Sequence, residues 1–285
     1  MHELAAGVYY EDSFISGNVA CITTGQGAVL IDSPMVPRDA WSWLKRIASF
    51  TNQGIALLIN TDYRLERVLG NCFFPTTGTI AHQAAWSQMQ RYDDNFLQRY
   101  VSRQRQILSG VASDLAKARI VLPELTLTSD LTLHKGNRLI RLLHAGGHTP
   151  ASILVHLPQE RILFTGDVVV TNQHPALDQA NTEQWLGALE AIRRMEDVDV
   201  IVPGHGETCL PVDTQVLTAY ITAICDRVYE HYEAGLTRRE TVDKVTMDDF
   251  FPIPSERRSA VERTIRGSVE RVYDEFKKAP QKRRG

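Results

Sequence analysis

The segment Thr61-Asp62-Tyr63-Arg64-Leu65-Glu66-Arg67 places two carboxylates and two guanidiniums directly after the apolar run Ile55–Ile59. Carboxylates can bind a divalent metal ion or act as general bases. Arginine keeps its proton near neutral pH and offers no lone pair, so it repels a metal ion instead of binding it. A solvated turn with alternating charges is the alternative interpretation, but the apolar run predicts a buried strand that leads into the segment.

Three further stretches place a histidine or an aspartate directly after a glycine, in a loop that follows a predicted strand. They are Gly147-His148, Gly166-Asp167 and Gly204-His205. Glycine lets the backbone turn sharply, which leaves the next side chain free to face a cleft. Each pair alone is common in structural turns. Two imidazoles and a carboxylate in this order, each after a strand, favour a divalent metal site.

The elements that must position these residues are short strands mixed with amphipathic helices along the whole chain. The periodicity predicts strands over 18–23, 28–32, 55–60, 78–82, 125–133, Arg138–His144, 152–157, 161–164 and 199–202. It predicts helices over Pro37–Phe50, 182–195, 213–232 and 255–276. This mixture indicates a single domain over residues 1–285, of class α/β or α+β with layered sheets.

Residues 84–118 differ from their surroundings, because they are polar and rich in glutamine and arginine. They predict one long helix and a shorter one, which cross outside the core as a lid or an interaction arm. This insert and the C-terminal helices over 213–276 could carry a homodimer contact. The basic residues 277–285 predict a frayed, solvated tail.

The composition excludes several classes of function. The chain of 285 residues has a net charge of −3 and a pI near 6.3, so it has no global basic field for nucleic acid or an anionic membrane. No apolar run approaches the ~20 residues of a membrane span, and no signal-peptide pattern is visible. Four widely spaced cysteines indicate reduced thiols. We therefore expect a cytoplasmic protein with a small-molecule ligand, and no nucleic-acid or membrane partner.

The order and context of the motifs resemble those of the metallo-β-lactamase fold superfamily. The resemblance covers about residues 8–212 and rests on Asp32-Ser33-Pro34, the strand before Thr61, Gly147-His148-Thr149-Pro150, Phe164-Thr165-Gly166-Asp167 and Pro203-Gly204-His205-Gly206. It implies a four-layer αβ/βα sandwich, in which two β-sheets pack face to face with helices outside. It also implies a metal cleft along one edge of the sheets.

The resemblance places residues 61–67 in the slot of the family's metal motif, Thr-His-x-His-x-Asp-His. The family pattern implies a first metal ion at positions 62, 64 and 148, and a second at 66, 67 and 205, with Asp167 bridging both. Arg64 and Arg67 occupy two of these positions, which argues against a dinuclear zinc site. We hypothesise that both arginines neutralise Asp62, Glu66 and Asp167 in a salt-bridge network at the former metal site.

A site with one ion remains open as an alternative. One possible set of ligands is Glu66, Asp167 and His205, and the other is Asp62, His148 and Asp167. The candidate metal ligands are therefore Asp62, Glu66, His148, Asp167 and His205, for at most one zinc, manganese or iron ion. Arg67 counts against the first set and Arg64 against the second.

The family's usual chemistry is hydrolysis by a metal-activated water, and three hypotheses follow from it. The first is a metal-depleted protein with weak or no hydrolase activity that binds a ligand or a partner. The second is a mononuclear hydrolase of an ester, lactone, thioester or phosphoester. The third is a metal-free enzyme in which Asp167 or His205 is the general base and Arg64 stabilises an oxyanion. In each, Tyr63, Arg67 and His174 are expected to contact the ligand.

Overall fold

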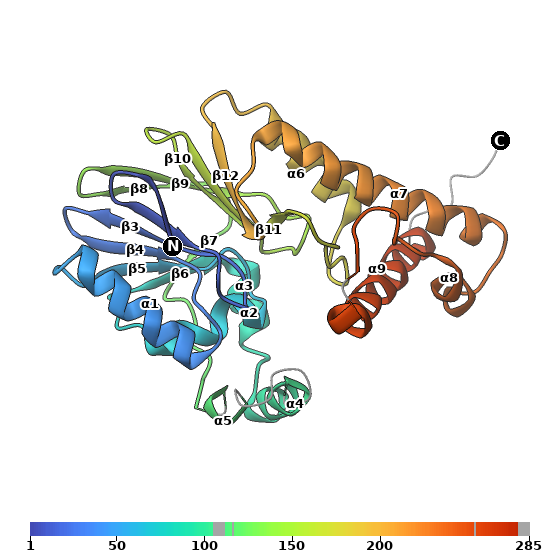
Figure 1. Ribbon diagram of the computed structural model, residues 1–285, viewed down its shortest axis with the longest axis horizontal. Coiled ribbons are helices and arrows are strands. Elements are labelled where there is room, and N and C mark those ends of the chain that lie inside the picture. Colours follow the sequence, from blue (N-terminus) through green and yellow to red (C-terminus); the bar gives the residue numbers. More distant parts are fainter. Residues whose placement is uncertain (105–111, 116, 254, 279–285) are drawn as a thin grey trace.

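The described strands form two β-sheets that lie face to face (Figure 1). The computed structural model describes residues 1–104, 112–115, 117–253 and 255–278. The first sheet keeps the chain order: β1 His2–Ala5, β2 Val8–Glu11, β3 Val19–Thr24, β4 Gly27–Ile31, β5 Ile55–Ile59, β6 Thr79–His82 and β7 Leu125–Leu127. The second sheet has the order β12-β11-β10-β9-β8: β12 Val200–His205, β11 Ile162–Val170, β10 Ile153–Leu157, β9 Arg138–His144 and β8 Leu131–Lys135.

The helices cover the outer faces of the sheets and extend beyond them. Helix α1 (Pro37–Phe50) covers the first sheet, and α6 (Thr182–Arg193) and α7 (Thr214–Glu233) pack against the second (Figure 1). The other helical segments are α2 Leu65–Val68, η1 Leu69–Phe73, α3 Gln83–Met89, α4 Asp94–Gln104, α5 Ala112–Leu115, η2 Pro211–Asp213, α8 Arg238–Lys244, η3 Ser255–Arg257 and α9 Arg258–Lys278.

The alternation of side chains along each inner strand creates the layers. In β4, Val29 and Ile31 point between the two sheets, whereas Ala28 and Leu30 face α1 and pack with Trp43. The second sheet does the same, with one set of side chains in the central layer and the other against α6 and α7. The predicted four-layer αβ/βα sandwich is therefore confirmed.

Several predicted elements differ from the structure. The strand predicted over 125–133 is two strands, because the chain crosses from β7 in the first sheet to β8 in the second. A bend at Thr128-Ser129 makes this crossing, and Asp130 fixes it by accepting a hydrogen bond from the backbone N–H of His144 (3.0 Å). Strands β1 and β2 and helix α8 were not predicted. Strands β11 and β12 run further than expected and include Asp167 and His205 themselves.

The insert over 84–118 forms α3, α4 and α5 rather than one long and one short helix, and residues 105–111 and 116 lie outside the described residues. It packs against the body of the protein, since Val101 and Leu115 join a buried cluster with Met35 and Leu69. In the described part of the chain, no helix is long and apolar enough to cross a membrane. Of the predicted basic tail, residues 279–285 also lie outside the described residues, and α9 includes the first two.

The layer between α1 and the first sheet gives a stability prediction. Trp43 is fully buried in this layer, whereas Trp41, two residues earlier on the same helix, is 50% exposed. Trp43→Ala should lower the free energy of unfolding by about 3–5 kcal/mol, because it leaves a cavity where an indole was packed. Trp41→Ala, the matched control, should change it by about 0.5 kcal/mol or less. Urea unfolding of both variants makes this comparison, and equal losses would contradict the packing described.

Candidate functional site

The loop after β5 is held in place by a buried aspartate at the end of β4. Asp32 accepts hydrogen bonds from the backbone N–H of Thr61 (2.8 Å) and from its hydroxyl (2.6 Å). Its backbone has a φ of +55°, a strained conformation that aims the carboxylate at this loop. Asp62 follows Thr61 and is also buried. Asp62 Oδ1 accepts a hydrogen bond from the backbone N–H of Arg64 (2.8 Å), the residue that precedes α2.

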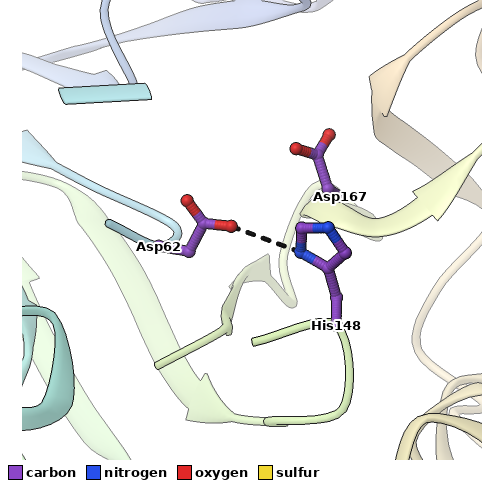
Figure 2. A group of neighbouring side chains, drawn as sticks. All are labelled: Asp62, His148 and Asp167. Carbon is purple, nitrogen blue, oxygen red and sulfur yellow. Dashed lines mark ion pairs between the residues drawn. The ribbon is translucent and has the colours of Figure 1, made fainter. Parts of the chain in front are cut away.

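Three buried side chains from distant parts of the chain meet next to this loop. The ligand atoms of Asp62, His148 and Asp167 all lie within 4.8 Å of one another. Figure 2 shows the Asp62 carboxylate directed at the imidazole of His148, with Asp167 above the ring. Asp62 Oδ2 lies 3.3 Å from His148 Nδ1. Two carboxylates and an imidazole are a ligand set for a divalent ion.

The Asp62 and His148 atoms that face each other lack hydrogen-bond partners among the described residues. Asp62 Oδ2 and His148 Nδ1 are both buried, and their geometry is not that of a hydrogen bond. Buried polar atoms are normally satisfied, because an unpaired one costs about 1–3 kcal/mol. A divalent ion between these atoms and Asp167 would satisfy both. The residues present therefore fit one metal ion.

The guanidinium of Arg67 occupies the other side of Asp167. It forms an ion pair with Asp167, and its Nη2 lies 3.1 Å from His205 Nδ1. It also donates hydrogen bonds to the backbone carbonyls of Asn18 (3.1 Å) and Gly204 (2.9 Å). Its side chain is only 1% exposed. A second metal ion does not fit here, because a permanent cation already lies against its candidate ligands.

Two glycines leave room for this guanidinium. A Cβ added to Gly17, whose φ is +103°, would lie 2.9 Å from both Nη atoms of Arg67. A Cβ added to Gly204 would overlap the Asp167 carboxylate and lie 2.6 Å from Arg67 Nη2. Asn18 connects this segment to the end of β12, since its side-chain amide donates hydrogen bonds to the carbonyls of Pro203 (2.9 Å) and Gly206 (2.8 Å). Sequence reasoning missed both residues: Asn18 was predicted to begin the strand over 18–23, and Gly17 lies directly before it.

Asp167 is ionised in this environment. Burial alone would raise its pKa, but Arg67, His205 and His148 outweigh burial and hold the pKa of Asp167 well below its usual range. His205 Nδ1 lies 2.9 Å from Asp167 Oδ1. The His205 side chain is 28% exposed, so its other face is open to the solvent side of the site.

Arg64 and Glu66 make their direct side-chain contacts with partners outside the predicted network. Arg64 forms an ion pair with Asp178 (2.9 Å), a residue that the sequence did not single out. Glu66 accepts a hydrogen bond from the Tyr100 hydroxyl (3.4 Å). Burial would lower the pKa of Arg64, but Glu66 and Asp178 together with other carboxylates raise it. Arg67 therefore makes direct contact with Asp167, while Arg64 pairs with Asp178.

A cavity of about 480 Å³ opens above these residues. The predicted site residues that line it are Arg64, Glu66, His148, Asp167, His174 and His205. His174 Nδ1 lies 3.1 Å from the Tyr220 hydroxyl, and its Nε2 lies 3.1 Å from the carbonyl of Phe251. Tyr63 is buried outside the cavity lining and donates a hydrogen bond to Gln179 (2.6 Å). Arg67 does not line the cavity either.

Comparison with known proteins identifies the family. A family model described as the Metallo-beta-lactamase superfamily matches residues 13–205, so the chain belongs to this superfamily, and the resemblance in the sequence is confirmed. Metallo-beta-lactamase type 2 of Bacillus cereus is 24% identical over 205 residues, which cover 70% of each chain.

The fold also occurs in solved structures, two of which illustrate the likeness. The stereoselective inverting sec-alkylsulfatase Pisa1 from Pseudomonas sp. is 16% identical with a TM-score of 0.73, over 96% of this chain and 49% of that one. A metallo-beta-lactamase family protein from Thermus thermophilus is 14% identical with a TM-score of 0.67, over 96% of this chain and 95% of that one. This chain therefore spans about half the length of the sec-alkylsulfatase.

The buried ion pair gives a stability prediction. Arg67→Met should lower the free energy of unfolding by about 3–5 kcal/mol, because Asp167 stays buried without its cation. The matched control is Arg64→Met, which removes a partly exposed pair with Asp178 and should cost about 1 kcal/mol or less. The double variant Arg67→Met with Asp167→Asn should recover part of the loss. Chemical denaturation tests all three, and equal losses in the two single variants would disprove the assignment.

Asp32 gives a pH prediction. Burial raises the pKa of Asp32 from its ordinary 3.8 to about 7, although Arg67 and the bonds from Thr61 act in the opposite direction, and Asp62 adds to the rise. Between pH 3.8 and about 7, Asp32 is therefore protonated in the folded state and ionised in the unfolded state. The free energy of unfolding should fall as the pH rises through this window.

The variant Asp32→Asn does not titrate at this position. Relative to it, the wild-type free energy of unfolding should fall by up to about 1.4 kcal/mol per pH unit between pH 3.8 and about 7. Denaturation curves of both proteins at pH 5, 6 and 7 measure the difference. A difference that is flat or rises with pH would show that Asp32 is ionised throughout.

Proposed function

We propose that this protein is a hydrolase that uses one divalent metal ion, held by Asp62, His148 and Asp167 at the floor of the cavity. The observation that carries the proposal is the pair of buried, unpartnered atoms, Asp62 Oδ2 and His148 Nδ1, beside a third potential ligand. The relatives support the class, because a metallo-beta-lactamase and an alkylsulfatase are both named as hydrolytic enzymes.

Arg67 explains why the proposal is limited to one ion. In the family pattern described above, Asp167 would bridge two ions, but here its second side faces a guanidinium. This cation supplies positive charge at a fixed position without being exchangeable. The proposal therefore predicts a mononuclear site in which Asp167 lies between two cations, the metal ion and the Arg67 guanidinium.

The residues of the site would have different roles in hydrolysis. Asp62, His148 and Asp167 would hold the divalent ion, which would supply Lewis acidity and lower the pKa of bound water. With a proton on Nδ1, His205 donates a hydrogen bond to Asp167 Oδ1, which leaves its other ring nitrogen to exchange a proton at the cavity wall. Arg64 lines the same cavity and offers a cation to a developing negative charge. The substrate classes are esters, lactones, thioesters and phosphoesters, and the name of the alkylsulfatase adds sulfate esters.

The second candidate function is a metal-free ligand-binding protein. It is favoured by the Arg67–Asp167 ion pair, which already neutralises one of the three potential ligands. Protonation of His148 would also let Asp62 and His148 pair directly across 3.3 Å. Metal content separates the two candidates.

We propose that the protein acts in the cytoplasm. The four cysteines, Cys21, Cys72, Cys209 and Cys225, are free thiols in the structure. Free thiols persist in reducing compartments, which supports this setting.

Metal analysis tests the proposed function. Protein loaded with zinc or manganese and then freed of excess ion should retain about one ion per chain, through the ligands Asp62, His148 and Asp167. Asp62→Asn should lose most of this ion, whereas Glu66→Gln, at a cavity residue outside the trio, should keep it. Inductively coupled plasma spectrometry measures the content, and circular dichroism confirms that each variant is folded.

Turnover of a panel of esters, lactones, thioesters, phosphoesters and sulfate esters should follow the metal content of each variant. It should disappear after chelation, return on addition of the ion, and be lost in Asp62→Asn. A folded wild-type protein that retains no ion would support the metal-free candidate instead. Two retained ions would contradict the assigned position of Arg67.

A further inference from the structure

One wall of the cavity comes from a part of the chain beyond the region that matches the family. Its residues are Pro252, Arg257, Ala260, Val261 and Thr264, whereas the family match ends at residue 205. Positions 257, 260, 261 and 264 have the spacing i, i+3, i+4 and i+7, so they lie on one face of the helical segment η3–α9. This face closes the cavity above the candidate metal centre.

Arg257 differs from the other arginine of this cavity, because no partner for its guanidinium is found among the described residues. Arg64 is paired with Asp178 (2.9 Å). Arg258, the next residue along the chain, lies 3.7 Å from Glu262. Arg257 itself is exposed and lines the cavity. Its five N–H donors and its charge are therefore available to a ligand.

The cavity also carries apolar surface beside this charge. Ile15 is 59% exposed and lines the cavity together with Val170, Ala260 and Val261. An exposed isoleucine gains free energy when a ligand covers it. The cavity therefore combines a free cation, an apolar wall and the candidate metal ligands His148 and Asp167.

We propose that Arg257 binds an anionic group of the substrate, separate from the bond that is hydrolysed, and so makes the enzyme selective for amphipathic esters with a negatively charged end. The proposal rests on the proposed function. A guanidinium matches a carboxylate, sulfate or phosphate through two parallel hydrogen bonds, and the apolar wall suits the chain that joins this group to the ester.

The turnover test uses two esters with the same leaving group in the zinc-loaded, full-length protein. 4-Nitrophenyl butyrate is neutral, and the mono-4-nitrophenyl ester of glutaric acid carries a carboxylate at the far end of a similar chain. The wild type should prefer the anionic ester, and Arg257→Ala should raise its KM by roughly tenfold while leaving the KM of the neutral ester unchanged. Arg257→Lys should restore part of the effect, since it keeps the charge.

The matched control is Arg263→Ala, which removes an exposed arginine from α9, the helix that directly follows Arg257, but outside the cavity lining. It should leave both esters unchanged. If Arg257→Ala and Arg263→Ala behave alike, or if both esters lose equally, then Arg257 is an ordinary solvated side chain and the inference is wrong, although the proposed function stands.

A binding measurement keeps the inference testable if no ester is turned over. Isothermal titration calorimetry with hexanoate and with 1-hexanol compares an anionic and a neutral probe of similar length. Hexanoate should bind the wild type more tightly, and Arg257→Ala should remove about the same tenfold preference. Loss of this preference without any turnover would support Arg257 and refute the hydrolase. Equal binding of both probes to the wild type and to Arg257→Ala would refute the role of Arg257.

Discussion

The buried guanidinium of Arg67 sets the charge balance of the whole site. Asp32, Asp62 and Asp167 all lie within the same buried region, and ionised carboxylates there repel one another unless cations lie between them. Arg67 contacts Asp167 directly and lies 3.9 Å from Asp32. Arg67 lowers the pKa of both acids, but the net shifts differ: burial outweighs it at Asp32, whereas direct contact, together with the histidines, outweighs burial at Asp167. Direct contact with Arg67 thus distinguishes Asp167, whose pKa is lowered, from Asp32, whose pKa is raised by burial.

This arrangement makes the two sides of Asp167 unequal. On the side of Arg67, each hydrogen-bonding group has a protein partner, including the backbone carbonyls of Asn18 and Gly204. On the side of Asp62 and His148, two buried atoms face each other without one. A buried polar site with unsatisfied atoms is costly, and a bound ion on the side of Asp62 and His148 would remove this cost. The asymmetry is the physical reason for proposing one ion.

Sequence reasoning placed most strands and the residues that end them, because each apolar run stops where a glycine and a polar residue begin. It found His148, Asp167 and His205 for this reason, and Asp62 from the charged segment after the run Ile55–Ile59; the structure brings the four together. It could not find the partner of Arg64, since Asp178 is 114 positions away and follows no motif. It also missed α8, although Thr237 and Glu240 form a capping box there that a closer reading of the sequence would have found. Partners that depend on how distant segments pack leave no local signal.

The C-terminal helices belong to the site as much as the sandwich does. Helix α9 holds the loop between β11 and α6 through two contacts: Ser268 accepts a hydrogen bond from the backbone N–H of Leu177 (3.0 Å), and Arg271 donates one to the carbonyl of Ala180 (2.6 Å). Asp178, between these two anchor points, pairs with Arg64. The helix that carries one cavity wall therefore also fixes Asp178, the counter-ion of Arg64, which lines the same cavity. A substitution in the C-terminal helices that moves this loop would change the charge at the candidate metal centre without touching any of its ligands, so the sandwich alone does not define the site.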